Sequence, residues 1–346
     1  TNQTLGSGNN YTTTPGQNGA VWDRKAVGFD LAYAEWKPDM FTTVQLGKMP
    51  IPWTTTVSYF WDKDLTPEGA ALKYVNGSLF ATATYNWLSE QNNAGSLLKS
   101  TDSKMASAQI GWKQLINSAT TLTGAVGYFN FNSVKDQPVT ATAGTGTAAG
   151  NCAYSAANPA FGGSSYGNTT YLVENKTGTP ATTDKNYNSC NLLQSDFNLV
   201  EAQVQLDTVV ATYPVSVFLD YLQNTGAVVN PTTNSKLDKA FSAGFTFNKA
   251  SAAKSWEAGV VYQKTEKDSV FGQFHDSDFG GGIVDTSGYA LKAAYVPVLG
   301  WTINATYLLN NRYNDVSAAV PNAASSAPKK NDQDYKRLQL DLNYKF

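Results

Sequence analysis

The last stretch of the chain, residues 335–346, alternates strictly between apolar and polar side chains, reading YKRLQLDLNYKF. Successive side chains of a β-strand point to opposite faces, so this stretch predicts a strand with one apolar and one polar face. The apolar positions are Leu338, Leu340, Leu342, Tyr344 and Phe346, and the polar ones include Arg337 and Asp341. One such strand fits either a soluble sandwich or a barrel in a membrane. The rest of the chain has to decide between the two.

The same alternation recurs along the chain and predicts thirteen strands. Many have about ten residues, the length that crosses a bilayer at a tilt. Charged residues are 15 % of the chain, whereas soluble domains have about 25 %. No helical stretch is left to cover the apolar faces, which disfavours a soluble sandwich. The predicted strands are 27–33, 41–49, 70–75, 78–88, 104–114, 119–131, 200–207, 213–221, 241–247, 256–262, 289–295, 301–307 and 335–346.

The connectors between these strands alternate in length without exception. The short ones are 37–40, 76–77, 115–118, 208–211, 249–254 and 296–300, and the long ones are 50–69, 89–103, 132–194, 223–238, 265–285 and 313–334. Tight turns at one rim and long loops at the other are typical of outer-membrane barrels. We therefore predict an all-β fold, a transmembrane antiparallel meander β-barrel. It forms a single domain over residues 1–346, with 132–194 as a long, irregular extracellular loop.

Aromatic residues on the apolar faces gather near the two ends of the predicted strands. Trp112, Tyr213, Phe247, Trp256, Tyr295, Trp301 and Phe346 lie toward the short turns, and Trp87, Tyr128, Tyr221 and Tyr262 lie toward the long loops. Amphipathic rings settle at the two interfaces of a bilayer. The two belts therefore support a membrane-spanning barrel.

The segments VQLGKMPIPW and WDKDLTPEGAALKY, within residues 44–74, and the terminal LDLNYKF resemble bacterial outer-membrane porins of the "Putative porin" family. This family is distant kin of the phosphate-selective and general trimeric porins. The resemblance implies a homotrimer in the bacterial outer membrane, in contact with lipid and lipopolysaccharide. It also implies that the outer-membrane assembly machinery reads the strand that ends at Phe346.

Strand number and the start of the chain are linked. Bacterial single-chain barrels have even strand numbers, and an upward strand should precede the one at Val27. Residues 1–24 do not alternate and are expected to form a loop. We therefore expect one or more N-terminal strands, or a tether domain, to precede this chain. Sixteen strands are favoured for the intact barrel, with 14 and 18 as alternatives.

The water-facing side chains indicate what the barrel can conduct. Those expected to line the pore are Asp30, Lys73, Lys113, Glu201, Asp207, Asp220, Glu257, Lys292, Arg312, Arg337 and Asp341. Both signs are present, so neither a strong cation filter nor a strong anion filter follows. The ladder of Lys and Arg that phosphate selectivity would require is missing. Passive diffusion of small polar solutes and ions, with weak charge selectivity, is the function that this lining favours.

Two loops are candidates for narrowing the pore. The first surrounds residues 61–68, where Asp62, Asp64 and Glu68 form an acidic cluster; it could equally be a solvated surface loop or a latch against a neighbouring subunit. The second carries the only two cysteines, Cys152 and Cys190. In an exported protein these residues are expected to form a disulfide.

Other functions find little support in the residues. The single histidine, His275, is expected to be an exposed loop residue. A catalytic serine would need a histidine held on a strand as its general base, and the sequence offers none. Asp276 and Asp278 suggest Ca²⁺ only weakly, and neither a metal nor a cofactor is predicted. The net charge of −2 gives no reason to expect nucleic acid as a partner. The alternative to a porin is a structural, envelope-tethering or surface-interaction protein of the outer membrane.

Overall fold

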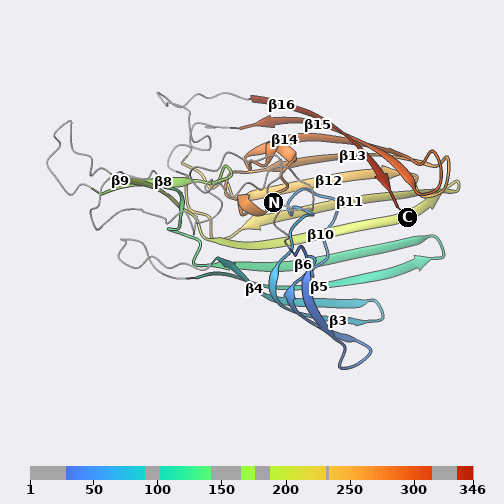
Figure 1. Ribbon diagram of the computed structural model, residues 1–346, viewed down its shortest axis with the longest axis horizontal. Helices are drawn as coiled ribbons and strands as arrows, with labels where there is room; N and C mark the ends of the chain where they lie inside the picture. Colours follow the sequence, from blue (N-terminus) through green and yellow to red (C-terminus); the bar gives the residue numbers. More distant parts are fainter. Residues whose placement is uncertain are drawn as a thin grey trace, which may run out of the picture.

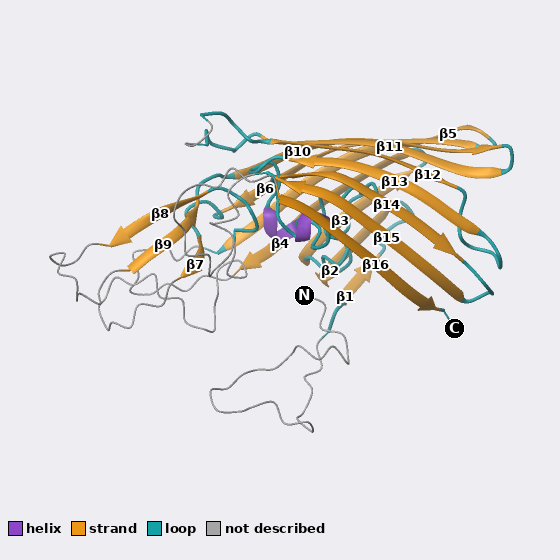
Figure 2. Ribbon diagram, turned by 90° about the horizontal axis from the view of Figure 1, so that it is seen from above, coloured by secondary structure: helices purple, strands orange, loops and turns teal. Residues whose placement is uncertain are grey.

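The computed structural model describes residues 29–89, 102–141, 165–175, 188–230, 234–313 and 333–345. Thirteen strands form one antiparallel sheet in sequence order, which confirms the predicted meander (Figure 1). They are β1 (Ala32–Trp36), β2 (Thr42–Lys48), β3 (Glu68–Asn76), β4 (Leu79–Ser89), β5 (Ser103–Asn117), β6 (Thr120–Asn132), β10 (Phe197–Val210), β11 (Tyr213–Asn224), β12 (Lys239–Phe247), β13 (Trp256–Thr265), β14 (Thr286–Tyr295), β15 (Trp301–Arg312) and β16 (Gln333–Tyr344). The sheet curves strongly, and two short 3₁₀ turns, η2 (Gly272–Phe274) and η3 (Phe279–Gly281), lie within its curve (Figure 2).

The strand register places all the tight turns at one rim. At this rim Trp301 pairs with Tyr344, so the chain also ends there (Figure 1). The β3–β4 turn has Gly77 at its first central position with φ 60°, a left-handed conformation that glycine adopts without strain. β1 and β16 are the two ends of the strand order, and within the described ranges they do not pair with each other. Residues 1–24, expected to form a loop, lie outside those ranges.

The outer face of the sheet is apolar and the inner face is largely polar. Alternating positions such as Ile110, Trp112, Val126 and Leu219 are exposed on the outside. Among the described residues, no helix has the length and apolar character required to cross a bilayer. In outer-membrane barrels, exposed apolar strand faces are the surface that lipid covers.

Rings on the outer face contact one another near the short-turn rim. The centroids of Tyr213 and Phe247 are 5.2 Å apart, and those of Phe247 and Trp256 are 5.8 Å apart. Trp301 and Tyr344 form a further pair at 4.8 Å. These pairs form one of the two aromatic belts that the sequence predicts.

The connection between β6 and β10 differs from the expectation of an irregular loop. It contains a second, three-stranded antiparallel sheet of β7 (Pro138–Ala141), β9 (Asn188–Leu193) and β8 (Thr170–Asn175). Val139 and Leu193 of this sheet are buried in the same apolar cluster as inward side chains of the main sheet. The short strands lie among Gly, Ser, Thr and Asn residues, which hide their period-two pattern from a reading of the sequence.

Candidate functional site

Two of the long connectors fold into the interior of the curved sheet. Loop A (residues 49–67) joins β2 to β3, and loop B (residues 266–285) joins β13 to β14. Loop A reaches the inner face of β5 and β10, where the carbonyl of Thr54 accepts hydrogen bonds from the side-chain amides of Gln109 at 2.9 Å and Gln203 at 2.6 Å. The backbone N–H of Thr54 also donates to Gln109 Oε1 at 2.8 Å. The inward segment is thus centred on residues 54–61, just before the acidic cluster.

Hydroxyl and indole groups of loop A bind two carboxyl groups of the sheet. Thr56 Oγ1 and Ser58 Oγ donate to Asp220 Oδ2 on β11 at 2.6 and 2.9 Å. The indole Nε1 of Trp61 donates to both carboxyl oxygens of Glu201 on β10 at 3.2 and 3.3 Å. Glu201 and Asp220 were expected to face pore water, but each is only 1 % exposed. Loop A covers both of them, so this part of the predicted pore lining is wrong.

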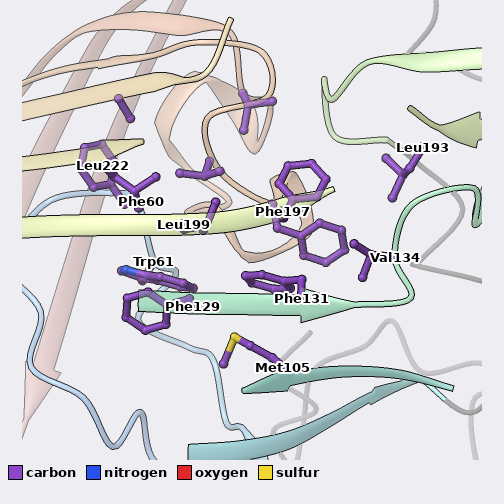
Figure 3. Packing of buried hydrophobic residues seen from close by; sticks show 14 of the residues in the cluster. Phe60, Trp61, Met105, Phe129, Phe131, Val134, Leu193, Phe197, Leu199 and Leu222 are labelled. Carbon is purple, nitrogen blue, oxygen red and sulfur yellow. The ribbon is translucent and has the colours of Figure 1, made fainter. Parts of the chain in front are cut away.

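Apolar side chains fill the interior near the long-loop rim. The Trp61 ring lies 4.7 Å from that of Phe129 (Figure 3). The Trp53 ring lies 5.3 Å from that of Phe129. From loop B, Phe271 contacts Phe131 at 5.2 Å between ring centroids. The inward aromatic residues of β6 were not predicted, because only the outward positions of that strand were assigned from its alternation. A strand that reads Tyr-Phe-Asn-Phe at 128–131 has aromatic residues on both faces, and that pattern signals a covered interior.

The two loops are bound to each other. Asp62 N–H donates to the Phe274 carbonyl at 2.8 Å, and Ser277 N–H donates to Asp62 Oδ2 at 3.2 Å. Asp276 N–H of loop B also donates to the Tyr59 carbonyl of loop A at 3.3 Å. Loops A and B therefore form one inward structure.

Loop B is anchored to the last two strands. Arg337 of β16 forms an ion pair with Asp278 at 2.7 Å, and Gln339 Nε2 donates to the same carboxylate at 2.7 Å. Arg312 of β15 donates from Nε to the Gly280 carbonyl at 2.6 Å. Together the loops extend from the β5–β10–β11 wall to the β15–β16 wall.

His275 is buried, which corrects the expectation of an exposed loop histidine. Its side chain lies within loop B, 3.2 Å from Gln263 Nε2 of β13, and the residue is 3 % exposed. Burial lowers the pKa of the His275 imidazole to about 4. Burial also raises the pKa of the neighbouring Asp276 carboxyl to about 6, although two backbone N–H groups donate to it. Both groups are thus largely neutral at mildly acidic pH.

A polar cavity of about 450 Å³ lies on the short-turn side of loop A. Its lining combines the hydroxyl groups of Thr54, Thr55 and Thr56 with three of the predicted pore residues. Those residues are Lys73, Lys113 and Asp207. The cavity brings charges of both signs together beneath the inward loop.

The remaining predicted residues are placed as follows. Lys292 Nζ lies 4.6 Å from the centroid of the Tyr59 ring, and Arg312 lies 4.7 Å from that of Tyr335. Glu257 is half-buried on β13, whereas Asp30, Asp64, Glu68 and Asp341 are exposed and Asp62 is half-buried. Leu338, Leu340, Leu342 and Tyr344 are exposed on the outer face of β16. Phe346 and Cys152 lie outside the described residues, and Cys190 is on β9.

The described side chains include no group of three or more His, Cys, Asp or Glu residues arranged to hold a metal ion. Asp276 and Asp278 instead accept hydrogen bonds from backbone N–H groups and from Gln339. The site is therefore one of hydroxyl, amide and carboxyl groups within a sheet that is apolar outside.

Solved structures with a similar chain path include an outer-membrane protein. Vibrio cholerae OmpT, described as outer-membrane expressed, is 13 % identical, with 88 % of this chain and 77 % of that chain covered and a TM-score of 0.41. A trimer form of OmpT is also 13 % identical, with 88 % of this chain and 77 % of that chain covered and a TM-score of 0.40. Pseudomonas aeruginosa OccK5 (OpdH) is 11 % identical, with 91 % of this chain and 70 % of that chain covered and a TM-score of 0.45.

The search among curated proteins finds no match to this chain. The sequence family described as "Putative porin" matches residues 1–346, the whole of the chain. With the antiparallel meander, the apolar outer face and the polar interior, this match means that the chain is a β-barrel protein of the outer membrane and belongs to the "Putative porin" family.

Proposed function

We propose that the protein forms a water-filled channel through which small polar solutes and ions diffuse passively, with weak charge selectivity. The polar cavity beneath loop A carries this proposal. Hydroxyl groups and charges of both signs line it, and Lys73 and Lys113 lie with Asp207 rather than in a ladder of one sign. Mixed charges favour hydrated solutes in general over one class of ion.

Loops A and B narrow the channel in this proposal. Three strands hold loop A against the inner wall: side-chain amides of β5 and β10 donate to the Thr54 carbonyl, and the hydroxyl groups of Thr56 and Ser58 donate to Asp220 of β11. Asp62 and Asp64 follow the inward segment of loop A and Glu68 begins β3; in this proposal the three form an acidic group at the narrowing.

We also propose that three copies assemble through the apolar outer face, within lipid and lipopolysaccharide and after insertion by the outer-membrane assembly machinery. The exposed Leu338, Leu340 and Leu342 of β16 would then contact either lipid or a neighbouring subunit. Crosslinking in native outer membranes tests the assembly, and a ladder that ends at three subunits is the expected result.

Conductance in a planar bilayer tests the channel. Stable steps of porin size, with a small reversal potential in a salt gradient, are expected. A bilayer that stays silent at high protein concentration would contradict the proposal. A silent bilayer would favour a structural or envelope-tethering role. The apolar cluster around Trp53, Trp61 and Phe129 would then stabilise a closed interior.

A further inference from the structure

Glu201 and Asp220 form a buried pair of acids in the wall of the barrel. Gln203 lies opposite Asp220 in the β10–β11 register, and Glu201 lies opposite Leu222, so the two acids occupy diagonal positions on the inner face. This register brings two buried carboxyl groups next to each other on the same face of the sheet. Two ionised carboxylates offer only acceptors, so a hydrogen bond between them would require a proton on one of them.

Among the described residues, no cation is paired with either acid. The described ion pairs include neither Glu201 nor Asp220. The residues that face the pair from each neighbouring element are uncharged: Gly127 of β6, Gln203 of β10, Leu222 of β11, Ser242 of β12, and Thr56, Ser58 and Trp61 of loop A. The nearest titratable groups along loop A are Tyr59 and Asp62. Two buried negative charges without a cation would be strongly unfavourable.

The hydrogen bonds indicate which acid holds the proton. Asp220 Oδ2 accepts from two hydroxyl groups, which stabilises a negative charge there. Asp220 Oδ1 is buried without an amide, hydroxyl or ring N–H donor among the described residues, and a carboxyl O–H of Glu201 would satisfy it. The proton therefore belongs on Glu201 and the charge on Asp220.

Within the described ranges, every non-carboxyl donor to this pair comes from loop A. We propose that Glu201 and Asp220 share a single proton and that this proton-bound pair positions loop A in the lumen. The inference rests on the proposed function in one respect: loop A must narrow a conducting pore. When the shared proton is lost to water, two buried carboxylates repel each other and are better solvated if loop A leaves the wall. The pore then widens at alkaline pH.

The first experiment measures single-channel conductance and reversal potential for the full chain in planar bilayers. Wild-type conductance is expected to rise at alkaline pH, and Glu201→Gln is expected to lose this rise, because the amide cannot ionise. Glu257→Gln is the matched control, since Glu257 also faces inward but lies outside the pair. At neutral pH, Glu257→Gln should shift the reversal potential toward anions, and Glu201→Gln should shift it much less. Equal shifts would mean that Glu201 is ionised and would overturn the proposal.

The second experiment does not depend on conduction. Trypsin cleavage after Lys63 of loop A is compared with cleavage after Lys254, an exposed residue of the β12–β13 turn. The ratio of Lys63 to Lys254 cleavage should increase at alkaline pH in the folded wild type and stay flat in Glu201→Gln. If the bilayer is silent but this ratio behaves as expected, the proposed channel fails and the proton-bound pair stands. If the ratio is the same in both proteins at every pH, the pair does not hold loop A.

Discussion

Trp61 Nε1 donates to Glu201 at 3.2 and 3.3 Å, and this contact joins residues that are 140 positions apart in the sequence. The indole ring packs on Phe129 at the same point. One side chain of loop A thus combines an apolar contact with a polar anchor on the barrel wall. The cost of losing the polar anchor alone can be measured.

Trp61→Phe keeps an aromatic ring but removes the N–H donor. Glu201 then loses a hydrogen bond while buried, so we expect a loss of about 1–3 kcal/mol in the free energy of unfolding. Denaturant unfolding followed by tryptophan fluorescence measures this loss. Trp53→Phe is the matched control, because Trp53 Nε1 is buried without a partner among the described residues and its ring packs on the same Phe129. An equal loss in both variants would show that ring packing alone decides stability.

Gly244 on β12 leaves room for the ring of Phe218 on β11. A Cβ atom at Gly244 would lie 2.1 Å from Phe218 Cε1, which is far inside contact distance. Gly244→Ala is therefore expected to displace the ring and lower the free energy of unfolding by about 1–3 kcal/mol. At Gly124, a Cβ atom would come no closer than 3.8 Å to another atom. Gly124→Ala should change stability by less than about 0.5 kcal/mol. Similar values for the two variants would contradict the close packing at Phe218.

His275 and Asp276 should give loop B opposite pH dependences. The folded pKa of His275 is about 4, below its ordinary value of 6.5, so the unfolded state binds the proton first and His275 destabilises the fold as pH falls from 6.5 to 4. The folded pKa of Asp276 is about 6, above its ordinary 3.8, so Asp276 destabilises the fold as pH rises from 3.8 to 6. Each group changes the free energy of unfolding by at most about 3 kcal/mol over its pH interval.

Single variants separate these two effects. His275→Gln should leave the Asp276 effect, so stability falls as pH rises from 4 to 6. Asp276→Asn should leave the His275 effect, so stability rises over the same interval. Denaturant midpoints measured across this pH range test both slopes. Slopes of the same sign in the two variants would mean that the burial of at least one group is wrong.

The acidic residues at the return of loop A should influence ion preference. Replacing Asp62, Asp64 and Glu68 together with Asn removes three negative charges from the narrowing. We expect the reversal potential to shift toward anions and the conductance to change. The same number of Asn substitutions in an exposed short turn is the control. An unchanged reversal potential would place these acids away from the path of ions.

Cys152 and Cys190 remain a predicted disulfide. The bond is expected to stabilise the ordered form of its loop by at most about 4 kcal/mol, because it restricts the unfolded chain. Electrophoretic mobility should therefore change on reduction, and neither thiol should be alkylated beforehand. Unchanged mobility together with alkylation of both thiols would rule out the bond.

Much of the fold could be predicted because its determinants are local. Strand faces follow from a period of two, so Ile110 and Trp112 are outside while Gln109 is inside, and the strand register preserves that division. The turns follow from short polar segments such as the one at Gly77. The lengths of the connectors then gave the meander order. None of these steps needs knowledge of contacts between distant residues.

The site could be predicted only in part. The inward direction of Glu201 and Asp220 follows from alternation, but their burial does not, because it depends on where loop A returns. The burial of His275 has the same origin, since loop B packs it against Gln263 of the preceding strand. The inward Phe129 and Phe131 were a local signal of a covered interior.

The sequence by itself determined the apolar outside, the polar inside and the order of the strands, because alternation acts residue by residue. Only the tertiary structure decided which inward groups meet water. Side chains from loop A, such as Thr56 and Trp61, cover carboxyl groups more than a hundred residues away. The physical reason is that the burial of a polar group depends on the hydrogen-bond partners that reach it, and these partners come from distant parts of the chain.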